Sequence, residues 1–294
     1  MKSGFVSIIG RPNVGKSTLI NAIINKKVAI TSDVSGTTRN IIQGIYNEEG
    51  YQIVFVDTPG IHKPINKLGK VLNKQALSLT KDVDLILFVV DAAAGIGKGD
   101  IFILNMLNNT QIPVILVLNK IDELNNAKIL KAIADYKDIY PFVEIVPTSA
   151  KTHDNITHLI TVIKKYLHDE VQYFPTDYYT SSSLKFMISE IVREKLLQVT
   201  EEEVPHSIAC YTTLYEEKSN VININVDIIV DRDSLKKIII GKNGSRLKQV
   251  GTLARMEIEE LTQKKVYLEL FVKATKNWKE KERYLVELGF VDNE

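Results

Sequence analysis

The sequence contains a single cysteine, Cys210, and no long apolar run. One cysteine excludes a disulfide within the chain and a metal site built from several cysteines. No apolar stretch approaches the ~20 residues that a membrane-spanning helix needs, so no transmembrane segment is expected. The first apolar run, 5–9, starts too early to leave room for a secretory signal peptide. The cytoplasm, where thiols stay reduced, is therefore the expected compartment.

Net charge is also nearly absent, because 37 Lys and Arg face 36 Asp and Glu. This balance excludes a protein that binds polyanions over its whole surface, although a local basic patch can still bind nucleic acid. The 294 residues suffice for two globular domains with sizeable cores.

Up to residue 169, short apolar runs alternate with segments of helical periodicity. Apolar strands separated by helices predict a mostly parallel sheet with helices on both faces. The run 41–46 precedes 51–56 across a short polar turn, which predicts an antiparallel hairpin and a sheet of six strands. The other predicted strands are 6–9, 85–90, 114–118 and 143–146, and the predicted helices are 17–25, 101–107, 127–136 and 156–167.

After residue 169 the pattern changes. Residues 170–182 contain Pro175, several tyrosines and the first two of the three consecutive serines 181–183, which is typical of a linker. A second domain, 183–294, then follows with a C-terminal extension. Its predicted elements are a helix at 184–200, strands at 206–215 and 221–231, helices at 234–240 and 245–261, and a strand at 266–272.

Residues 10–17 read Gly-Arg-Pro-Asn-Val-Gly-Lys-Ser and fit the phosphate-loop pattern G-x-x-x-x-G-K-[ST] between a predicted strand and a predicted helix. Backbone N–H groups of such a loop surround phosphate oxygens at the positive end of the helix. Lys16 is predicted to reach the β- and γ-phosphates, and the Ser17 hydroxyl to bind Mg²⁺. The nucleotide contacts predicted here are Gly10, Arg11, Pro12, Asn13, Val14, Gly15, Lys16, Ser17 and Thr18.

Residues 119–122, Asn-Lys-Ile-Asp, follow directly after the predicted strand 114–118. The Asp122 carboxylate can accept from both N1–H and the exocyclic amine of guanine, a pair of donors that adenine lacks. Lys120 would cover the base and ribose, and the Ala150 N–H would meet guanine O6. The order of these motifs after the phosphate loop predicts GTP rather than ATP. The base contacts predicted are Asn119, Lys120, Ile121, Asp122, Ser149, Ala150 and Lys151.

The segment Asp57-Thr58-Pro59-Gly60 ends the run 53–56, where a metal-binding carboxylate and a γ-phosphate sensor are needed. Asp57 is predicted to act on Mg²⁺ through water, and Gly60 to offer its N–H to the γ-phosphate. Thr38, preferred over Thr37, is predicted to complete the metal ligands with Ser17. Ile61 stands where several GTPases carry a water-orienting glutamine, and it cannot hydrogen-bond water. Slow hydrolysis is therefore expected, with catalysis assigned to Lys16, Thr38, Asp57 and Gly60, and with Thr58, Pro59 and Ile61 also beside the nucleotide.

In the second domain, the segment 241–244 reads Gly-Lys-Asn-Gly and separates the predicted helices 234–240 and 245–261. Such a break lets a nucleic-acid backbone approach closely, although it also occurs in ordinary helix–turn–helix pairs. From 234 to 256 there are six basic residues and no acidic ones, which favours contact with single-stranded RNA. The predicted RNA contacts are Lys236, Lys237, Ile240, Gly241, Lys242, Asn243, Gly244, Arg246 and Lys248.

Together these motifs carry a resemblance. The first 169 residues resemble a translation-factor-class small GTPase domain, and the order α-β-β-α-α-β with G-x-x-G resembles a bacterial-type (type II) KH domain. A single GTPase domain followed by a KH domain resembles the Era family, and the likeness continues in 190–197, 203–207, 239–244, 266–273 and 277–278. One departure is Gly36, where Era proteins are expected to carry glutamine. With this glycine, the segment 35–39, Ser-Gly-Thr-Thr-Arg, resembles the switch loop of tandem-domain ribosome GTPases or of the tRNA-modification GTPase.

The resemblance implies binding of the single-stranded 3′ end of 16S rRNA and assistance to assembly of the 30S ribosomal subunit, with GTP favouring the RNA-binding state and hydrolysis favouring release. It also implies Mg²⁺ as cofactor, K⁺ held through Asn13, a monomer, and at most a peripheral contact with the inner membrane surface. A nucleotide-stabilised RNA chaperone and a tRNA-directed GTPase are the alternatives.

Overall fold

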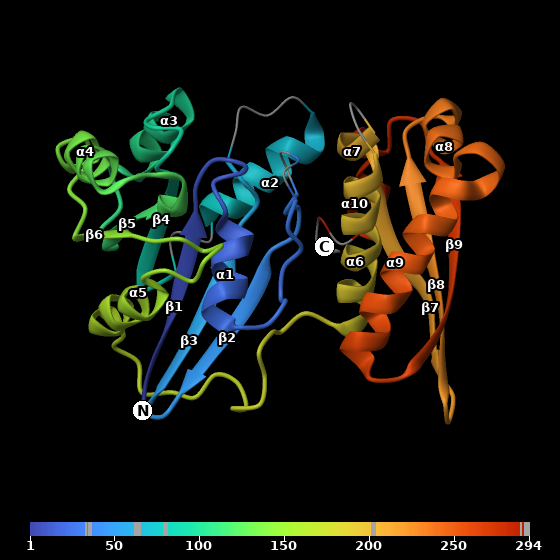
Figure 1. The fold of residues 1–294 in the computed structure, drawn as a ribbon, viewed down its shortest axis with the longest axis horizontal. Helices are drawn as coiled ribbons and strands as arrows, with labels where there is room; N and C mark the ends of the chain where they lie inside the picture. Colours follow the sequence, from blue (N-terminus) through green and yellow to red (C-terminus); the bar gives the residue numbers. More distant parts are fainter. Residues whose placement is uncertain are drawn as a thin grey trace. The chain divides into compact units, whose positions relative to one another are not determined.

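The structure, a computed structural model, describes residues 1–32, 34, 37–61, 66–78, 82–200, 204–288 and 290. The chain divides into two compact units: Met1–Ile65 with Gly69–Ser181, and Asn66–Leu68 with Ser182–Glu294 (Figure 1). No helix among the described residues combines the length and the apolar character needed to cross a bilayer.

The first unit is built on a six-stranded sheet in the order β2-β3-β1-β4-β5-β6. Within this sheet, as far as the structure describes it, only the hairpin of β2 and β3 is antiparallel, and the other neighbours are parallel. The predicted mostly parallel sheet and its hairpin are therefore confirmed. The strands are β1 Lys2–Ile9, β2 Ile42–Glu48, β3 Tyr51–Asp57, β4 Leu85–Asp91, β5 Val114–Asn119 and β6 Glu144–Pro147.

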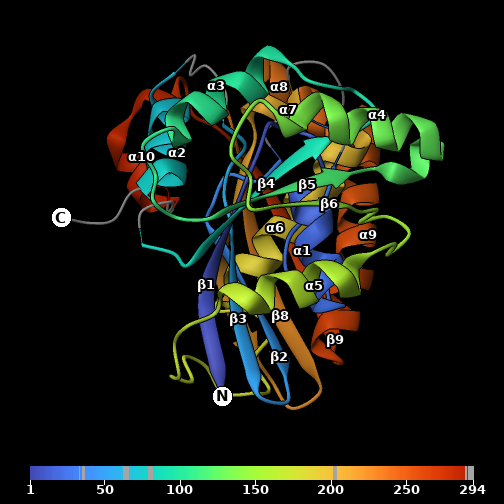
Figure 2. The ribbon, with the colours of Figure 1, turned by 90° about the vertical axis from the view of Figure 1, so that its left-hand side faces the viewer.

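Nearly every side chain of the central strands is apolar, so both faces of this sheet need cover. Helices supply it, and these side chains are buried. Alternate residues of β4, such as Phe88 and Val90, pack against residues of α2, α3 and α4, while α1 and α5 contact each other (Figure 2). The helix at 67–78 was not predicted. The helices are α1 Lys16–Ile24, α2 Lys67–Ser78, α3 Lys98–Leu107, α4 Asn126–Lys137 and α5 Ile156–Ile163, with short 3₁₀ turns η1 Ile121–Glu123 and η2 Lys164–Tyr166.

The segment predicted as a linker, 170–182, is hydrogen-bonded to the sheet of the first unit, and that unit ends at Ser181. The fully buried Gln52 side chain of β3 accepts from the N–H groups of Tyr173 (2.8 Å) and Phe174 (3.0 Å), and donates to the Phe174 carbonyl (2.8 Å). Farther on, Thr180 donates to the backbone carbonyl of Gln43 (2.8 Å). These contacts make 170–181 a strap along the sheet, and the linker prediction did not anticipate them.

The second unit has the predicted order α-β-β-α-α-β. Its strands pair in the order β7-β8-β9, with β7 antiparallel and β9 parallel to β8. One expectation was wrong: residues 206–207 end a short helix instead of starting a strand. The elements are α6 Leu184–Val199, α7 Val204–Ser207, β7 Ala209–Glu217, β8 Val221–Val230, α8 Asp233–Ile240, η3 Lys242–Gly244, α9 Ser245–Thr262, β9 Lys265–Ala274, η4 Trp278–Glu280 and α10 Glu282–Glu287.

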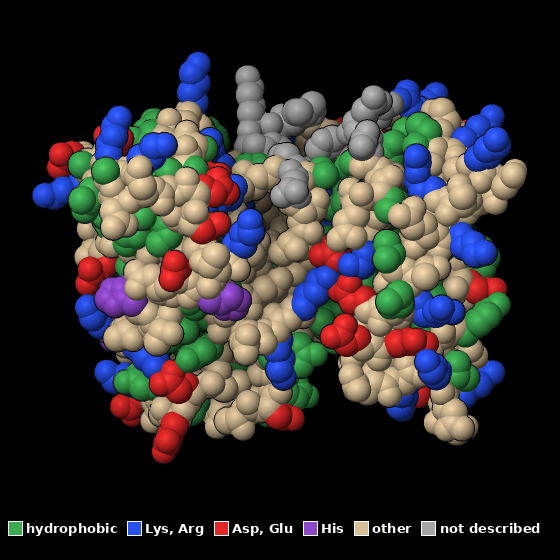
Figure 3. All heavy atoms as spheres, in the orientation of Figure 1, with side chains coloured by type: hydrophobic (Ala, Val, Ile, Leu, Met, Phe, Trp, Pro, Cys, Tyr) green, Lys and Arg blue, Asp and Glu red, His purple; other side chains and the backbone are tan. Residues whose placement is uncertain are grey.

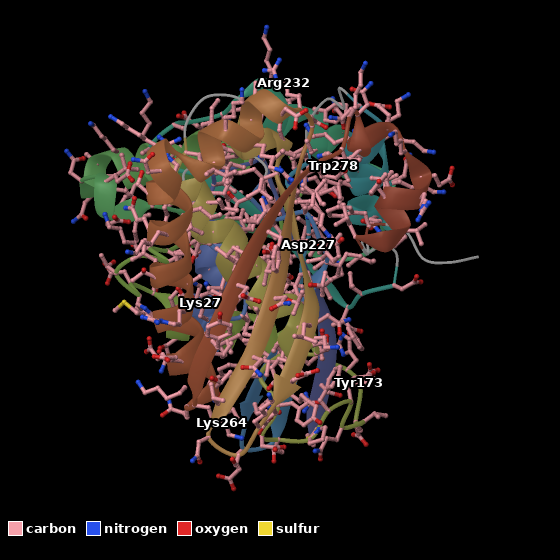
Figure 4. All side chains as sticks on the ribbon, turned by 90° about the vertical axis from the view of Figure 1, so that its right-hand side faces the viewer. Lys27, Tyr173, Asp227, Arg232, Lys264 and Trp278 are labelled. Carbon is pink, nitrogen blue, oxygen red and sulfur yellow. The ribbon has the colours of Figure 1, made fainter. Side chains whose placement is uncertain are left out.

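Helices cover one face of the three-stranded sheet. Alternate residues of β8, including Ile224, Val226 and Ile228, are buried against α6, α8 and α9. Asp227 therefore points to the opposite face, where its carboxylate accepts from the Tyr211 hydroxyl (2.9 Å) and pairs with Lys273. Figure 4 looks toward this sheet and labels Asp227.

Candidate functional site

The phosphate-loop segment lies between β1 and α1, as predicted. Gly15 has a φ of 93°, and a Cβ atom there would lie 2.3 Å from Asn119 Nδ2, so both the backbone conformation and the space require glycine. Lys16, almost fully buried, folds over the loop and donates to the carbonyls of Gly10 (3.2 Å) and Arg11 (2.9 Å). Burial lowers the pKa of Lys16 to about 8, partly opposed by the charge of Asp57. Among the described residues, the Lys16 ammonium thus has carbonyl oxygens but no carboxylate at hydrogen-bond distance.

The structure brings Ser17, Thr38 and Asp57 together. The hydroxyls of Ser17 and Thr38 lie 2.7 Å apart, and Ser17 donates to Asp57 Oδ2 at 2.9 Å. Thr38 lies 3.5 Å from the same carboxylate oxygen, whereas the Thr37 hydroxyl donates to the Val34 carbonyl at 2.6 Å. This geometry distinguishes the two threonines, because the Thr38 hydroxyl lies against Ser17 of the loop, whereas the Thr37 hydroxyl donates to Val34. Gly36, the departure noted in the sequence, lies outside the described residues.

Asp57 itself is fully buried at the end of β3. Its Oδ1 atom has no hydrogen-bond partner among the described residues. Burial raises the pKa of Asp57 to about 6, although Lys16 and the hydroxyls of Ser17 and Thr38 oppose the change. A buried carboxylate oxygen with no partner is unfavourable unless something outside the chain, such as a cation, satisfies it.

The residues after Asp57 have different roles. The Thr58 hydroxyl is buried and donates to the Ile8 carbonyl at 2.9 Å, so it ties β3 to β1. Gly60 lies against the phosphate loop, because a Cβ atom there would approach Pro12 N to 2.9 Å. Ile61 is 1% exposed and packs in the core with Phe88. Its side chain is therefore directed into the core.

The guanine-type motifs meet at Asn119. Its side-chain amide donates to the Val14 carbonyl of the phosphate loop (2.8 Å), and its oxygen accepts from the Ala150 N–H (3.0 Å). The Ser149 hydroxyl donates to Asp122 Oδ1 at 2.6 Å and so fixes the carboxylate predicted to read guanine. One side chain, Asn119, thereby holds the phosphate loop and the 149–151 segment together, with Ile121 and the exposed Lys151 at their edges.

Lys120 is positioned from a strand that the sequence argument had not connected to it. Its ammonium lies 2.6 Å from Asp91 Oδ2 at the end of β4. The other Asp91 oxygen accepts from the N–H groups of Ala93 and Ala94, both at 3.0 Å. Asp91 gave no signal in the sequence, because a strand-ending aspartate has no fixed partner until the sheet order places β4 beside β5.

A cleft lies over this end of the first unit. It is lined by predicted residues, by Thr37, which the sequence analysis had set aside in favour of Thr38, and by Ile30, Thr31 and Ser32 after α1, which the sequence reasoning missed. Its lining comprises Pro12, Asn13, Gly15, Lys16, Ser17, Thr18, Ile30, Thr31, Ser32, Thr37, Thr38 and Gly60. The Arg11 side chain does not line it, and instead contacts Asp100 of α3.

The second unit carries a groove between α9 and β9, next to the G-x-x-G break. Two predicted RNA contacts, Gly244 and Lys248, line it, together with Arg255, Tyr267 and apolar residues of both elements. The other seven predicted residues do not line it; Arg246, for example, donates to the Ile238 carbonyl of α8 at 2.6 Å. Figure 3 shows Lys and Arg side chains gathered around α8 and the start of α9. The groove lining is Gly244, Leu247, Lys248, Gly251, Thr252, Arg255, Val266, Tyr267, Leu268 and Leu270.

Two family models match the chain in the same order. Residues 5–120 match a model described as a 50S ribosome-binding GTPase, and residues 203–279 match a KH domain. A curated relative, GTPase Era of Geobacter metallireducens, is 49% identical over 98% of this chain and 98% of its own length. The chain belongs to the Era family of GTPases.

Solved Era structures agree with this assignment. Era of Aquifex aeolicus, a point variant bound to GDP and AlF₄⁻, is 41% identical, covers 99% of this chain and 100% of its own, and superposes with a TM-score of 0.96. An Era complex with MgGDPNP and nucleotides 1506–1542 of 16S ribosomal RNA has the same identity and TM-score, covering 99% of both chains. The predicted family, fold and GTPase activity are thereby confirmed.

Proposed function

We propose that this Era-family GTPase is a guanine-nucleotide switch that holds the single-stranded 3′ end of 16S rRNA and assists assembly of the 30S ribosomal subunit. One observation supports this above the others: a phosphate-loop cleft and a G-x-x-G groove occur in one chain that matches, over 99% of its length, an Era structure containing MgGDPNP and that end of the rRNA. Neither half alone would favour ribosomal RNA over other partners.

Mg²⁺ would be held by the hydroxyls of Ser17 and Thr38, with Asp57 acting through water. Hydroxyl and carboxylate oxygens are the ligands that Mg²⁺ prefers, and the unpartnered Oδ1 of Asp57 fits a site completed by a cation and its water. When bound, the metal would neutralise charge on the β- and γ-phosphates.

The chain's own groups would supply the rest of the phosphate chemistry. The Lys16 ammonium, which now donates to carbonyls 2.9–3.2 Å away, would exchange them for phosphate oxygens. The Gly60 N–H would respond to the γ-phosphate from its position against Pro12. Because Ile61 is directed into the core, the attacking water would be oriented by backbone groups, and hydrolysis would be slow. Asn13 would hold K⁺ beside the phosphates, and equal hydrolysis rates in KCl and NaCl would contradict that assignment.

Single-stranded RNA suits the groove of the second unit. Lys248 and Arg255 offer positive charge from α9, while Tyr267, 58% exposed on β9, offers a ring on which a base can stack. Bases in a duplex would not reach these groups. Coupling to the nucleotide requires only that RNA bind one nucleotide state more tightly than the other. We expect the chain to work in this way as a cytoplasmic monomer, with at most a peripheral membrane contact.

Crosslinking the bound RNA in cells and sequencing it tests the partner. The 3′ end of 16S rRNA should dominate, and exchanging both Lys248 and Arg255 for Ala should abolish the crosslinks. A matched variant with Lys128 and Lys131, two exposed lysines of α4, exchanged for Ala should retain them. Dominant tRNA reads would instead identify a tRNA-directed GTPase.

Single-turnover hydrolysis with and without a 16S 3′-end oligonucleotide tests the switch. GTP should be cleaved in both cases, and RNA affinity should differ between a non-hydrolysable GTP analogue and GDP. Equal RNA affinities would refute the switch and leave a nucleotide-stabilised RNA chaperone.

A further inference from the structure

Arg11 occupies a variable position of the phosphate-loop pattern, yet its side chain is firmly held. Its Nε donates to Asp100 Oδ1 at 2.8 Å, and Nη2 donates to the Gly95 carbonyl at 3.3 Å. Asp100, in the first turn of α3, is fully buried. A buried carboxylate needs such a partner, because an isolated charge in the interior is strongly unfavourable. The loop is therefore anchored to α3 through one side chain.

The segment before and within α3 is shaped around this anchor. A Cβ atom at Gly97 would lie 2.6 Å from Arg11 Nη1, and one at Gly99 would lie 2.7 Å from Arg11 Cδ and 3.0 Å from Cγ. Contacts below 3 Å are too short for non-bonded carbon atoms, so any larger residue must displace Arg11. Two glycines thus leave a channel that the arginine fills.

Asp100 is hydrogen-bonded on both oxygens. Its Oδ2 accepts from the Gly97 N–H at 2.8 Å and lies 3.4 Å from the hydroxyl of Tyr136 in α4. Burial, together with the Asp100 charge, raises the pKa of Tyr136, which keeps that hydroxyl a donor. Contacts from Gly97 and from Tyr136 of α4 therefore hold the Asp100 carboxylate in place, and its other oxygen accepts from Arg11.

The other end of the anchor lies where phosphates would bind. The Arg11 carbonyl accepts from Lys16 Nζ at 2.9 Å, and the next residue, Pro12, lies against Gly60. A phosphate loop acts through backbone N–H groups, so its affinity depends on how accurately that backbone is placed. Nothing in the Arg11 side chain needs to touch the nucleotide for it to matter.

We propose that Asp100 is a positioning residue for phosphate binding, which fixes residues 10–12 against α3 through the Arg11 side chain. This rests on the assignment of Gly10–Ser17 as the phosphate loop. The competing interpretation is that Asp100 only caps α3, and then nucleotide affinity of the folded protein would not depend on Arg11.

The test measures affinity for Mg·GTP by equilibrium binding, at a temperature well below unfolding, in the full chain. Arg11→Met should lower affinity by about tenfold or more, and Arg11→Lys, which keeps a cation for Asp100 but loses the Gly95 contact, should fall in between. Asp100→Asn should add little to Arg11→Met, because both act through one contact. Lys164→Met, which removes the exposed ion pair with Glu48 in the same unit, is the matched control and should bind GTP as the wild type does.

Gly99→Ala separates positioning from folding. Alanine favours the helix that contains residue 99, which offsets part of the cost of displacing Arg11 from the buried Asp100 carboxylate. Gly99→Ala should therefore lower the Tm less than Arg11→Met does, and a GTP affinity reduced to a similar extent in both variants supports the proposal. The proposal is overturned if Arg11→Met and Gly99→Ala bind GTP within about twofold of the wild type. It is also overturned if the losses of Arg11→Met and Asp100→Asn add in the double variant. A wild-type chain that failed to bind GTP would instead refute the proposed function.

Discussion

Replacing Asp57 with asparagine should stabilise the protein in the absence of nucleotide and metal, while removing its function. Asp57 is fully buried, and burial raises its pKa from 3.8 to about 6 even though Lys16, Ser17 and Thr38 favour the charged form. The folded state therefore disfavours the carboxylate, and asparagine resembles the neutral acid in shape.

The magnitude follows from the size of that shift. From 3.8 to about 6 is about two pKa units, or about 3 kcal/mol. A group whose pKa is raised on folding contributes stability that is complete below the unfolded pKa and is lost as pH rises through the folded pKa. At about pH 7.5 the wild type has lost this contribution, so Asp57→Asn should raise the free energy of unfolding by up to about 3 kcal/mol, and by less at about pH 5.

Urea denaturation in EDTA after removal of nucleotide, followed by circular dichroism at both pH values, measures this difference. Asp135→Asn, which changes an exposed carboxylate of α4, should alter stability by less than about 0.5 kcal/mol. Fluorescence of Trp278, the single tryptophan, reports the second unit and serves as an internal reference. Mg·GTP should stabilise the wild type more than the variant. An unchanged or lower stability of Asp57→Asn at the higher pH would refute the reasoning.

Further predictions at four positions concern base choice and RNA. Asp91→Asn keeps an oxygen for the turn but removes the charge that holds Lys120, so guanine nucleotide affinity, measured by titration, should fall about fivefold, and an unchanged affinity would contradict the role. Asp122→Asn should lower GTP affinity by at least about a hundredfold and shift preference toward xanthine, which competition binding would detect. At Gly244 a Cβ atom would meet no described residue within 4 Å, so Gly244→Asp should weaken RNA binding through its charge. Gly244→Ala, the control, should lose only about 1 kcal/mol of stability at a φ of 77°. At Gly241 the Cβ atom would lie 2.9 Å from Arg246 Cβ, so Gly241→Asp and Gly241→Ala should mainly impair folding. If Gly241→Ala and Gly244→Ala both folded normally and lost RNA binding equally, this difference between the two glycines would be contradicted.

The sequence was sufficient for two structural features that depend on residues close together in the chain. The phosphate loop and the α-β-β-α-α-β order are local patterns of this kind. The choice of Thr38 over Thr37 was also made from sequence, and the structure places Thr38 beside Ser17 while turning Thr37 toward Val34. Its role as a metal ligand remains a prediction.

Contacts between distant residues could not be predicted from sequence. Arg11 and Asp100 are 89 positions apart, and only the packing of α3 beside the phosphate loop makes them partners. The groove residues Arg255 and Tyr267 come from two elements whose pairing depends on how α9 lies on β9. The helix at 67–78 was missed because its apolar residues are interrupted by Gly69 and by lysines.

The strap formed by 170–181 bears on whether the first unit can exist alone. A fragment ending at residue 169 would leave the fully buried amide of Gln52 without its three hydrogen bonds to Tyr173 and Phe174. Each buried polar group left without a partner costs about 1–3 kcal/mol, a large fraction of a domain's total stability. A fragment that keeps these hydrogen bonds and the rest of the first unit must therefore extend to Ser181.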